Sequence, residues 1–91
     1  MDVDTVNKQL LLLRHLLLMP NTDVSWSSYN GADEVISDLD NIQEGLLIND
    51  KASKDRLRLM LAPTGALQEI SLSSGWGNEF LEIAESIEKA L

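Results

Sequence analysis

The sequence contains no cysteine, one histidine and only seven Lys or Arg residues among 91 positions. The absence of cysteine excludes disulfides and thiolate metal sites, and it is compatible with a reducing compartment. Fifteen Asp or Glu residues give a formal net charge of −8. Because phosphate backbones and anionic lipids repel such a chain, we expect neither nucleic acid nor membrane as a partner.

Aromatic residues are also scarce: two tryptophans, one tyrosine and one phenylalanine, in a chain whose hydrophobic residues make up 44%. A chain of this size buries only about 60–65% of its unfolded surface, so most of its long aliphatic side chains must enter the core. We therefore expect a single domain spanning residues 1–91.

The leucine-rich segment Gln9–Met19 resembles an export signal in its apolar content. However, Asp2 and Asp4 precede it where a signal peptide carries positive charge, and no small-residue cleavage site follows. Arg14 and His15 divide the apolar run, which is far shorter than the roughly 18–20 residues needed to span a bilayer. The segment is typical of a core helix, and we expect a cytoplasmic protein.

The first helix is expected from Val3 to Met19, because the residue before Pro20 is pushed out of the helical region. Its apolar positions recur at helical spacing on one face. Leu11 and Leu18 fall on the opposite, polar side, seven residues apart. Either another element covers them, or they form the contact of a homodimer. The core face comprises Val3, Val6, Leu10, Leu13 and Leu17, widened by Leu12 and Leu16.

Two further long helices follow from the same spacing. Asn30 is the expected N-cap of the second, which runs through Glu44 and either ends at Gly45 or continues to Ile48. Asn78 is the expected N-cap of the last helix, which extends to the end of the sequence. Apolar residues recur at three- and four-residue steps in both, at Val35, Ile36, Leu39, Ile42 and Leu46, and at Phe80, Ile83, Ala84, Ile87 and Leu91.

The segment between these helices is ambiguous. Arg56–Ala62 alternates like a strand and could pair with residues 67–72 through a turn at residues 63–65, giving an α+β fold with a β-hairpin. Its residues are helix formers, and none is β-branched or aromatic. We therefore favour a mainly α bundle of three long helices and one or two short ones, with Ser53 as the N-cap of a short third helix. Residues 65–74 are then expected to be a turn and a short helical or irregular stretch, anchored by Leu67, Ile70 and Leu72.

The sequence shows no catalytic motif. Asp38–Gln43 lacks the ligand spacing and glycine of a calcium loop, and His15 has no triad context. Gly65 and Gly75 lead into no phosphate-binding motif. We therefore expect no enzyme, cofactor or metal, although an enzyme based on grouped carboxylates would need only a deep acidic pocket.

Charge placement is more informative than any motif. No Lys or Arg lies between Arg14 and Lys51, whereas the second helix is rich in Asp and Glu, and Lys51–Arg58 is basic. The pattern indicates either an ordinary solvated face or an acidic helix that steers a basic protein partner. Aromatic residues in loops either anchor a partner or close a small core. The candidate partner-binding residues are Trp26, Tyr29, Asp33, Glu34, Asp38 and Trp76.

The segments Leu61–Gly65, Leu67–Ile70 and Gly75–Gly77, the last running into Glu79–Leu81, together resemble a signature of small bacterial proteins of unknown function. The loop Ser25–Ser28 before a helix is similar to theirs as well. The resemblance covers about two thirds of the chain. It implies a bacterial origin, and it carries over no site residue.

These observations predict a non-catalytic interaction protein that binds a basic partner, in the manner of small acidic immunity or antitoxin proteins. The alternative is a domain that associates with itself through Leu11 and Leu18.

Overall fold

The computed structural model describes residues 1–25 and 27–91, which form five helices and no strand. The expectation of a mainly α domain with three long helices and one or two short ones is confirmed, and the described residues contain two short helices. The helices are α1 (Val3–Leu17), α2 (Ala32–Leu47), α3 (Lys51–Leu61), α4 (Ala66–Ser74) and α5 (Gly77–Ala90).

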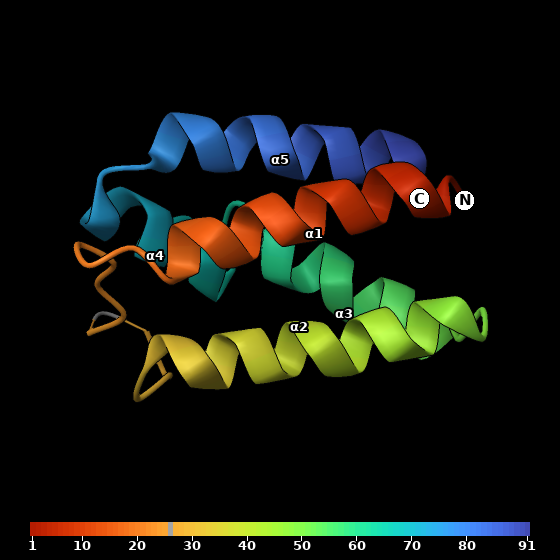
Figure 1. Ribbon diagram of the computed structural model, residues 1–91, viewed down its shortest axis with the longest axis horizontal. Helices are drawn as coiled ribbons and strands as arrows, with labels where there is room; N and C mark the ends of the chain where they lie inside the picture. The colour runs from red at the N-terminus through yellow and green to blue at the C-terminus, as the bar shows by residue number, and fades with distance from the viewer. Residues whose placement is uncertain (26) are drawn as a thin grey trace.

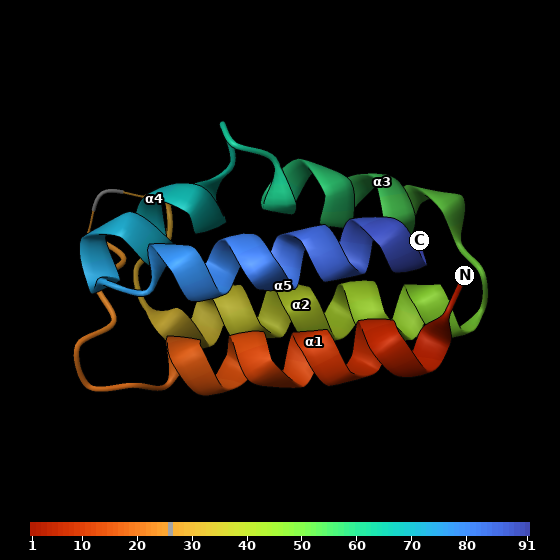
Figure 2. The ribbon, with the colours of Figure 1, turned by 90° about the horizontal axis from the view of Figure 1, so that it is seen from above.

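The helices form a closed ring around one core. Figure 1 shows α1 between α5 and α2, with α3 and α4 behind them, and α1 running antiparallel to both neighbours. In Figure 2, α3 and α4 follow one another along one edge. Packing closes in the order α1, α2, α3, α4, α5 and back to α1. The fold is thus a four-helix bundle in which two short helices occupy one position.

The core contains buried apolar residues at three- and four-residue steps along each of the three long helices. Phe80 and Trp76 supply its aromatic part, and Ser71 and Ser74 are buried beside them. Burial at steps of three and four is the pattern expected of amphipathic helices around a shared core. The buried apolar residues are Val6, Leu10, Leu13, Leu17, Val35, Leu39, Ile42, Leu46, Leu57, Leu61, Leu67, Ile70, Trp76, Phe80, Ile83 and Ile87.

Helix α1 begins at an aspartate cap. The Asp2 carboxylate accepts a hydrogen bond from the Thr5 backbone N–H at 3.2 Å and another from the Thr5 hydroxyl at 2.7 Å. These bonds lower the pKa of Asp2, the hydroxyl contributing most. The helix ends at Leu17 rather than Met19. The Leu18 N–H still makes a helical bond to Arg14 O, but the Met19 N–H bonds to Leu16 O, only three residues back.

Three predictions about side-chain burial were wrong. Val3 was expected on the core face of α1, but it is 37% exposed because it is the first residue of the helix, at the end of the bundle. Leu12 was expected to widen the core face of α1, but it is half exposed because it lies at the edge facing α5. Leu72 was expected to anchor the segment that is now α4, but it is largely exposed, whereas Leu67 and Ile70 of the same helix are buried.

Helix α2 begins one residue later than expected, with Gly31 rather than Asn30 as its N-cap. The Asn30 side chain does not cap the helix. Instead, the Glu34 carboxylate reaches back and accepts from the Asn30 backbone N–H at 2.9 Å. This bond joins the third residue of α2 to the residue before the cap, so Glu34 ties the incoming chain to the first turn although Gly31 has no capping side chain.

The connection between α2 and α3 is a tight helical hairpin. Asn49 adopts a left-handed conformation with φ 59°, and the N–H groups of Asn49 and Asp50 bond to the carbonyls of Leu46 and Gly45. This pair of bonds is a Schellman motif, and Asn is among the few residues that tolerate such a φ.

Helix α3 begins three residues earlier than expected, because Asp50 rather than Ser53 is its N-cap. The Asp50 carboxylate accepts from the Ala52 N–H at 3.3 Å and from the Ser53 hydroxyl at 2.9 Å. Ser53 is therefore a buried first-turn residue, and its side chain faces Gly45 of α2. A Cβ at Gly45 would overlap the Ser53 hydroxyl and lie 2.7 Å from the Ser53 Cβ, so glycine allows the two helices to approach closely.

The β-hairpin alternative is wrong, because residues 56–62 lie mostly in α3 and residues 67–72 lie in α4. Leu57 and Leu61 are buried four residues apart, whereas Leu59 between them is exposed, so the apparent alternation came from one leucine outside the core face. The helices are separated at Pro63–Gly65. A Cβ at Gly65 would lie 2.6 Å from the Leu59 carbonyl oxygen, so the turn requires glycine.

Helix α5 begins at Gly77, with Trp76 at the N-cap position in place of the expected Asn78. Its apolar face is buried at Phe80, Ile83 and Ile87, as expected. The opposite face carries the row of exposed glutamates, and Lys89 Nζ lies 3.1 Å from Glu85 Oε1.

Candidate functional site

The outer face of α2 is acidic. Asp33, Glu34, Asp40 and Glu44 are exposed, and the helix contains no Lys or Arg. Asp33, Asp40 and Glu44 follow one another at steps of seven and four, which places them on the side opposite the buried Val35, Leu39, Ile42 and Leu46. We call these four carboxylates the acidic face of α2.

A cation from α1 partly neutralises this face. The Arg14 guanidinium donates to both Asp40 Oδ1 and Gln43 Oε1, and the Gln43 amide donates to Asn7 Oδ1 at 2.8 Å. Arg14 was expected on the solvent side of the first helix, but its side chain is only 18% exposed because it lies in the seam between α1 and α2. The carboxylates of Asp40 and Glu34 therefore already have hydrogen-bond partners within the fold, so Asp33 and Glu44 are the carboxylates of this face that are more available to a partner.

The structure joins two of the predicted site residues, Tyr29 and Asp38. The Tyr29 hydroxyl donates to Asp38 Oδ2 at 2.8 Å, and both side chains are half-buried. Burial, together with the hydrogen bond and negative charge of Asp38, raises the pKa of Tyr29 to about 12, although the nearby Arg56 opposes the rise. This pair fastens the loop before α2 to the helix, which leaves little of either side chain to contact a partner.

Trp76 is a core residue and cannot serve as the exposed anchor considered from sequence. It is only 3% exposed, and its indole Nε1 donates to Thr22 Oγ1 at 3.3 Å. Ser74 fixes the same junction, because its backbone carbonyl accepts from the Asn21 amide at 2.7 Å and its hydroxyl accepts from the Asp23 N–H at 2.8 Å. Trp26, the other predicted tryptophan, lies outside the described residues.

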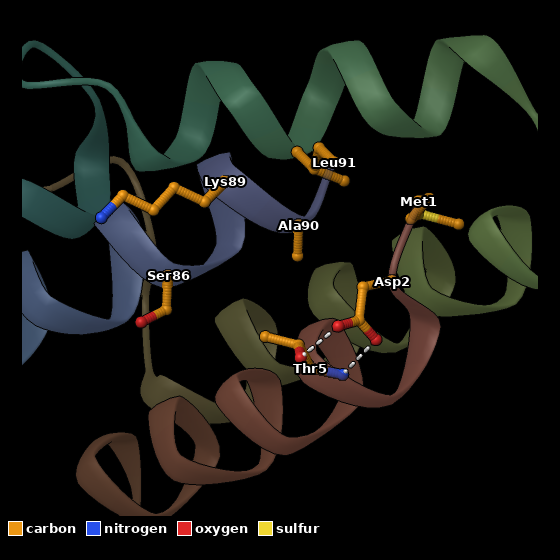
Figure 3. A pocket seen from close by; sticks show the side chains of 7 residues that line it. All are labelled: Met1, Asp2, Thr5, Ser86, Lys89, Ala90 and Leu91. Carbon is orange, nitrogen blue, oxygen red and sulfur yellow. Dashed lines mark hydrogen bonds between the residues drawn. The ribbon is translucent and has the colours of Figure 1, made fainter.

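A hollow of about 590 Å³ lies where the two ends of the chain meet. Figure 3 shows both carboxylate oxygens of Asp2 turned toward Thr5, and Lys89 extending away from them. The Asp2 N–H donates to the Ala90 carbonyl at 2.8 Å, which joins the start of α1 to the end of α5. Because Asp2 caps α1 and Lys89 is paired with Glu85, we interpret this hollow as part of the contact between the two ends of the chain rather than as a binding site.

A second concavity, the α1–α5 groove, has a volume of about 360 Å³. Its apolar part comes from both helices, and its rim carries the carboxylates of α5 and the only histidine. The rim groups are exposed to solvent rather than enclosed in the deep acidic pocket that a carboxylate enzyme requires. The groove is lined by Gln9, Leu12, His15 and Leu16 of α1 and by Glu79, Glu82, Ile83 and Ser86 of α5.

Sequence reasoning did not find this groove. It assigned Leu12 to the core, and that assignment depended on the pattern within a single helix. The groove exists because α1 packs beside α5, a pairing of chain ends that periodicity within one helix does not reveal. Leu12 lines the groove between the two paired helices and is therefore half exposed.

The leucines considered for a homodimer are on the surface: Leu11 is 52% exposed and Leu18 is 68% exposed. In residues 1–25 and 27–91, no three His, Asp or Glu side chains are grouped so that they could hold a metal ion. Nor does any helix in that part of the chain have the length and apolar content needed to cross a membrane.

Comparison with known proteins gave no relative. No protein-family model matches the chain, and neither a curated protein nor a solved structure matches it.

Proposed function

We propose that this protein is a non-catalytic interaction module of the bacterial cytoplasm that binds a basic protein partner through the acidic face of α2. The observation that carries the proposal is the exposure of Asp33, Glu34 and Glu44 on a helix without a single cation. A surface of one sign steers an oppositely charged partner and raises the association rate more than it lowers the dissociation rate.

Neutralisation of a basic protein, as by small acidic immunity or antitoxin proteins, is the mode of action that suits this charge. The overall charge of −8 adds a long-range attraction to the local one. Because Asp38 is bonded to Tyr29 and Asp40 to Arg14, the attraction should depend on Asp33 and Glu44 more than on these two aspartates.

The test is to capture proteins from a bacterial lysate at low salt, produce the captured basic protein in pure form, and measure its association rate with the wild type. We expect the double substitution Asp33→Lys and Glu44→Lys to slow association about tenfold, and added salt to do the same. Glu69→Lys, at an exposed position of α4, is the control for a change of charge elsewhere, and it alters the net charge half as much as the double substitution does. Equal rates for the wild type and the double variant would contradict the proposal.

Self-association through Leu11 and Leu18 is the second candidate, and it is favoured by the exposure of both side chains. Sedimentation equilibrium of the wild type and of Leu11→Asp tests it. A dimer that Leu11→Asp converts to a monomer would support the candidate, whereas a wild type that is monomeric at every concentration would end it.

A further inference from the structure

The α1–α5 groove combines an apolar floor with an acidic rim. Ile83 of α5 is buried at its base, Leu16 is half-buried, and Leu12 is 49% exposed although it lies in the seam between two packed helices. An uncovered leucine at such a seam presents apolar surface in a concave place, where an incoming side chain could be enclosed on several sides.

The rows of residues that line the groove run parallel to the helices. On α5, residues 79, 82, 83 and 86 follow the i, i+3, i+4, i+7 pattern of one helix face, and on α1 residues 9, 12 and 16 follow the same pattern. Seven residues of helix span about 10 Å, so the groove is about two helical turns long. This length and its direction between two antiparallel helices suit a third helix laid along it.

The charge at the rim decides which occupant fits. Glu79 and Glu82 are exposed, and among the side chains that the structure describes neither has a Lys, Arg or His nitrogen within 4.0 Å, whereas the neighbouring glutamates of α5 are paired with Lys89 and Arg58. A second copy of the chain would bring a further −8 charge toward these carboxylates, and an anionic ligand would also be repelled. A ligand that carries both apolar side chains and cationic groups complements the apolar floor and the acidic rim of the groove.

We infer that the α1–α5 groove receives the apolar side chains of a basic amphipathic helix, with Lys or Arg residues of that helix beside Glu79 and Glu82. The inference rests on the proposed function, because this helix would belong to the basic partner. It adds a second contact on a different pair of helices from the acidic face of α2. The apolar floor would supply affinity, and the two carboxylates would select a cationic rather than an anionic helix.

The probe is a synthetic helical peptide built from Lys and Leu in an amphipathic pattern, and its counterpart carries Glu in place of every Lys. Binding of each peptide to the intact protein is measured by calorimetry, and the contact site is located by amide chemical-shift changes. We expect the basic peptide to bind with shifts along the groove, and the acidic peptide not to bind. Leu12→Gln and the double variant Glu79→Gln/Glu82→Gln should each weaken binding about tenfold.

Two control variants change the same residue types outside the groove. Leu81→Gln changes an exposed leucine of α5 outside the groove, and Glu69→Gln removes one exposed carboxylate of α4; neither should alter binding. Because Leu12 is half exposed, Leu12→Gln should fold normally, which circular dichroism checks. If that variant fails to fold, the double glutamate variant still tests the rim.

Several outcomes would overturn the inference. They are equal binding of the two peptides, insensitivity to the groove variants, wild-type dimerisation that depends on Leu12, and a small molecule retained in the groove of the purified protein. The proposed function is tested separately by Asp33→Asn/Glu44→Gln. If only this variant weakens binding, the acidic face of α2 stands and the groove inference fails. If the wild type binds no basic peptide and captures no basic protein, both fail.

Discussion

Replacement of Gly45 by alanine tests how closely α2 and α3 approach. In an exposed helix, Gly→Ala stabilises the fold by about 1 kcal/mol, because alanine has the higher helix propensity. At Gly45 the new methyl would overlap the Ser53 hydroxyl and lie 2.7 Å from the Ser53 Cβ, which no rotation of the Ser53 side chain can move. The structure therefore predicts a change of the opposite sign.

The magnitude follows from what must move. Turning the Ser53 hydroxyl aside breaks its 2.9 Å bond to Asp50, a loss of about 1 kcal/mol. Displacing the start of α3 to relieve the Cβ contact costs about 1–3 kcal/mol, as in other overpacked interiors. After the gain in propensity is subtracted, Gly45→Ala should lower the free energy of unfolding by about 1–3 kcal/mol. For a domain of this size, each kcal/mol lowers Tm by about 4–8 °C.

Urea and thermal unfolding of Gly45→Ala, Ser53→Gly and the double variant form the assay. The double variant should be more stable than the sum of the two single changes predicts, because Ser53→Gly removes the atoms that collide. Gly77→Ala is the control, since a Cβ there meets only the flexible end of Leu72 at 3.2 Å and should be close to neutral. A Gly45→Ala protein as stable as the wild type would refute the close approach of the two helices.

Three further predictions concern titration and capping. Tyr29 is the only tyrosine, and its pKa of about 12 leaves about a tenth of it ionised at about pH 11, against about nine tenths at the ordinary 10.0. Tyrosinate absorbance measured against pH should show this, and Asp38→Asn should lower the midpoint of that titration. Because the pKa of Tyr29 is raised in the folded protein, the contribution of its protonated hydroxyl to stability is complete below pH 10.0 and is lost as the pH rises toward 12. Asp2 and Asp23 behave in the opposite way, since hydrogen bonds hold their pKa values below 3.8. The contribution of these two carboxylates to stability is complete above pH 3.8 and is lost as the pH falls below it. Asp2→Asn should therefore make Tm depend less on pH in the acid range. Asp50→Ala removes the cap of α3 and should lower the free energy of unfolding by about 0.5–2 kcal/mol in urea, and an unchanged midpoint would count against the cap.

The long helices were predictable because the spacing of apolar residues within each one indicates which face is buried. Phe80, Ile83 and Ile87 are buried at the spacing the sequence shows, and Pro63 marks the end of α3. The caps were less predictable. Asn30 and Ser53 are good cap residues by type, but Gly31 and Asp50 occupy the cap positions, and Glu34 accepts from the Asn30 N–H ahead of α2. Sequence alone does not decide between nearby polar residues.

The candidate site was predictable only in part. The exposed acids of α2 follow from the helix pattern, and so does the exposure of Leu11 and Leu18. The commitment of Arg14 to Asp40 and the burial of Trp76 depend on contacts between residues 26 or more positions apart. Such contacts are set by how the helices pair in the ring.

The division of one bundle position into α3 and α4 affects how the molecule opens. Helices of 11 and 9 residues are shorter than the roughly 12–15 residues that an isolated helix needs in water, so neither persists without the rest of the core. Native-state hydrogen exchange should therefore find the amides of these two helices among the first to lose protection, while α1 and α5 retain theirs until global unfolding. Helices α3 and α4 would then open together in partial unfolding, while the rest of the bundle unfolds cooperatively.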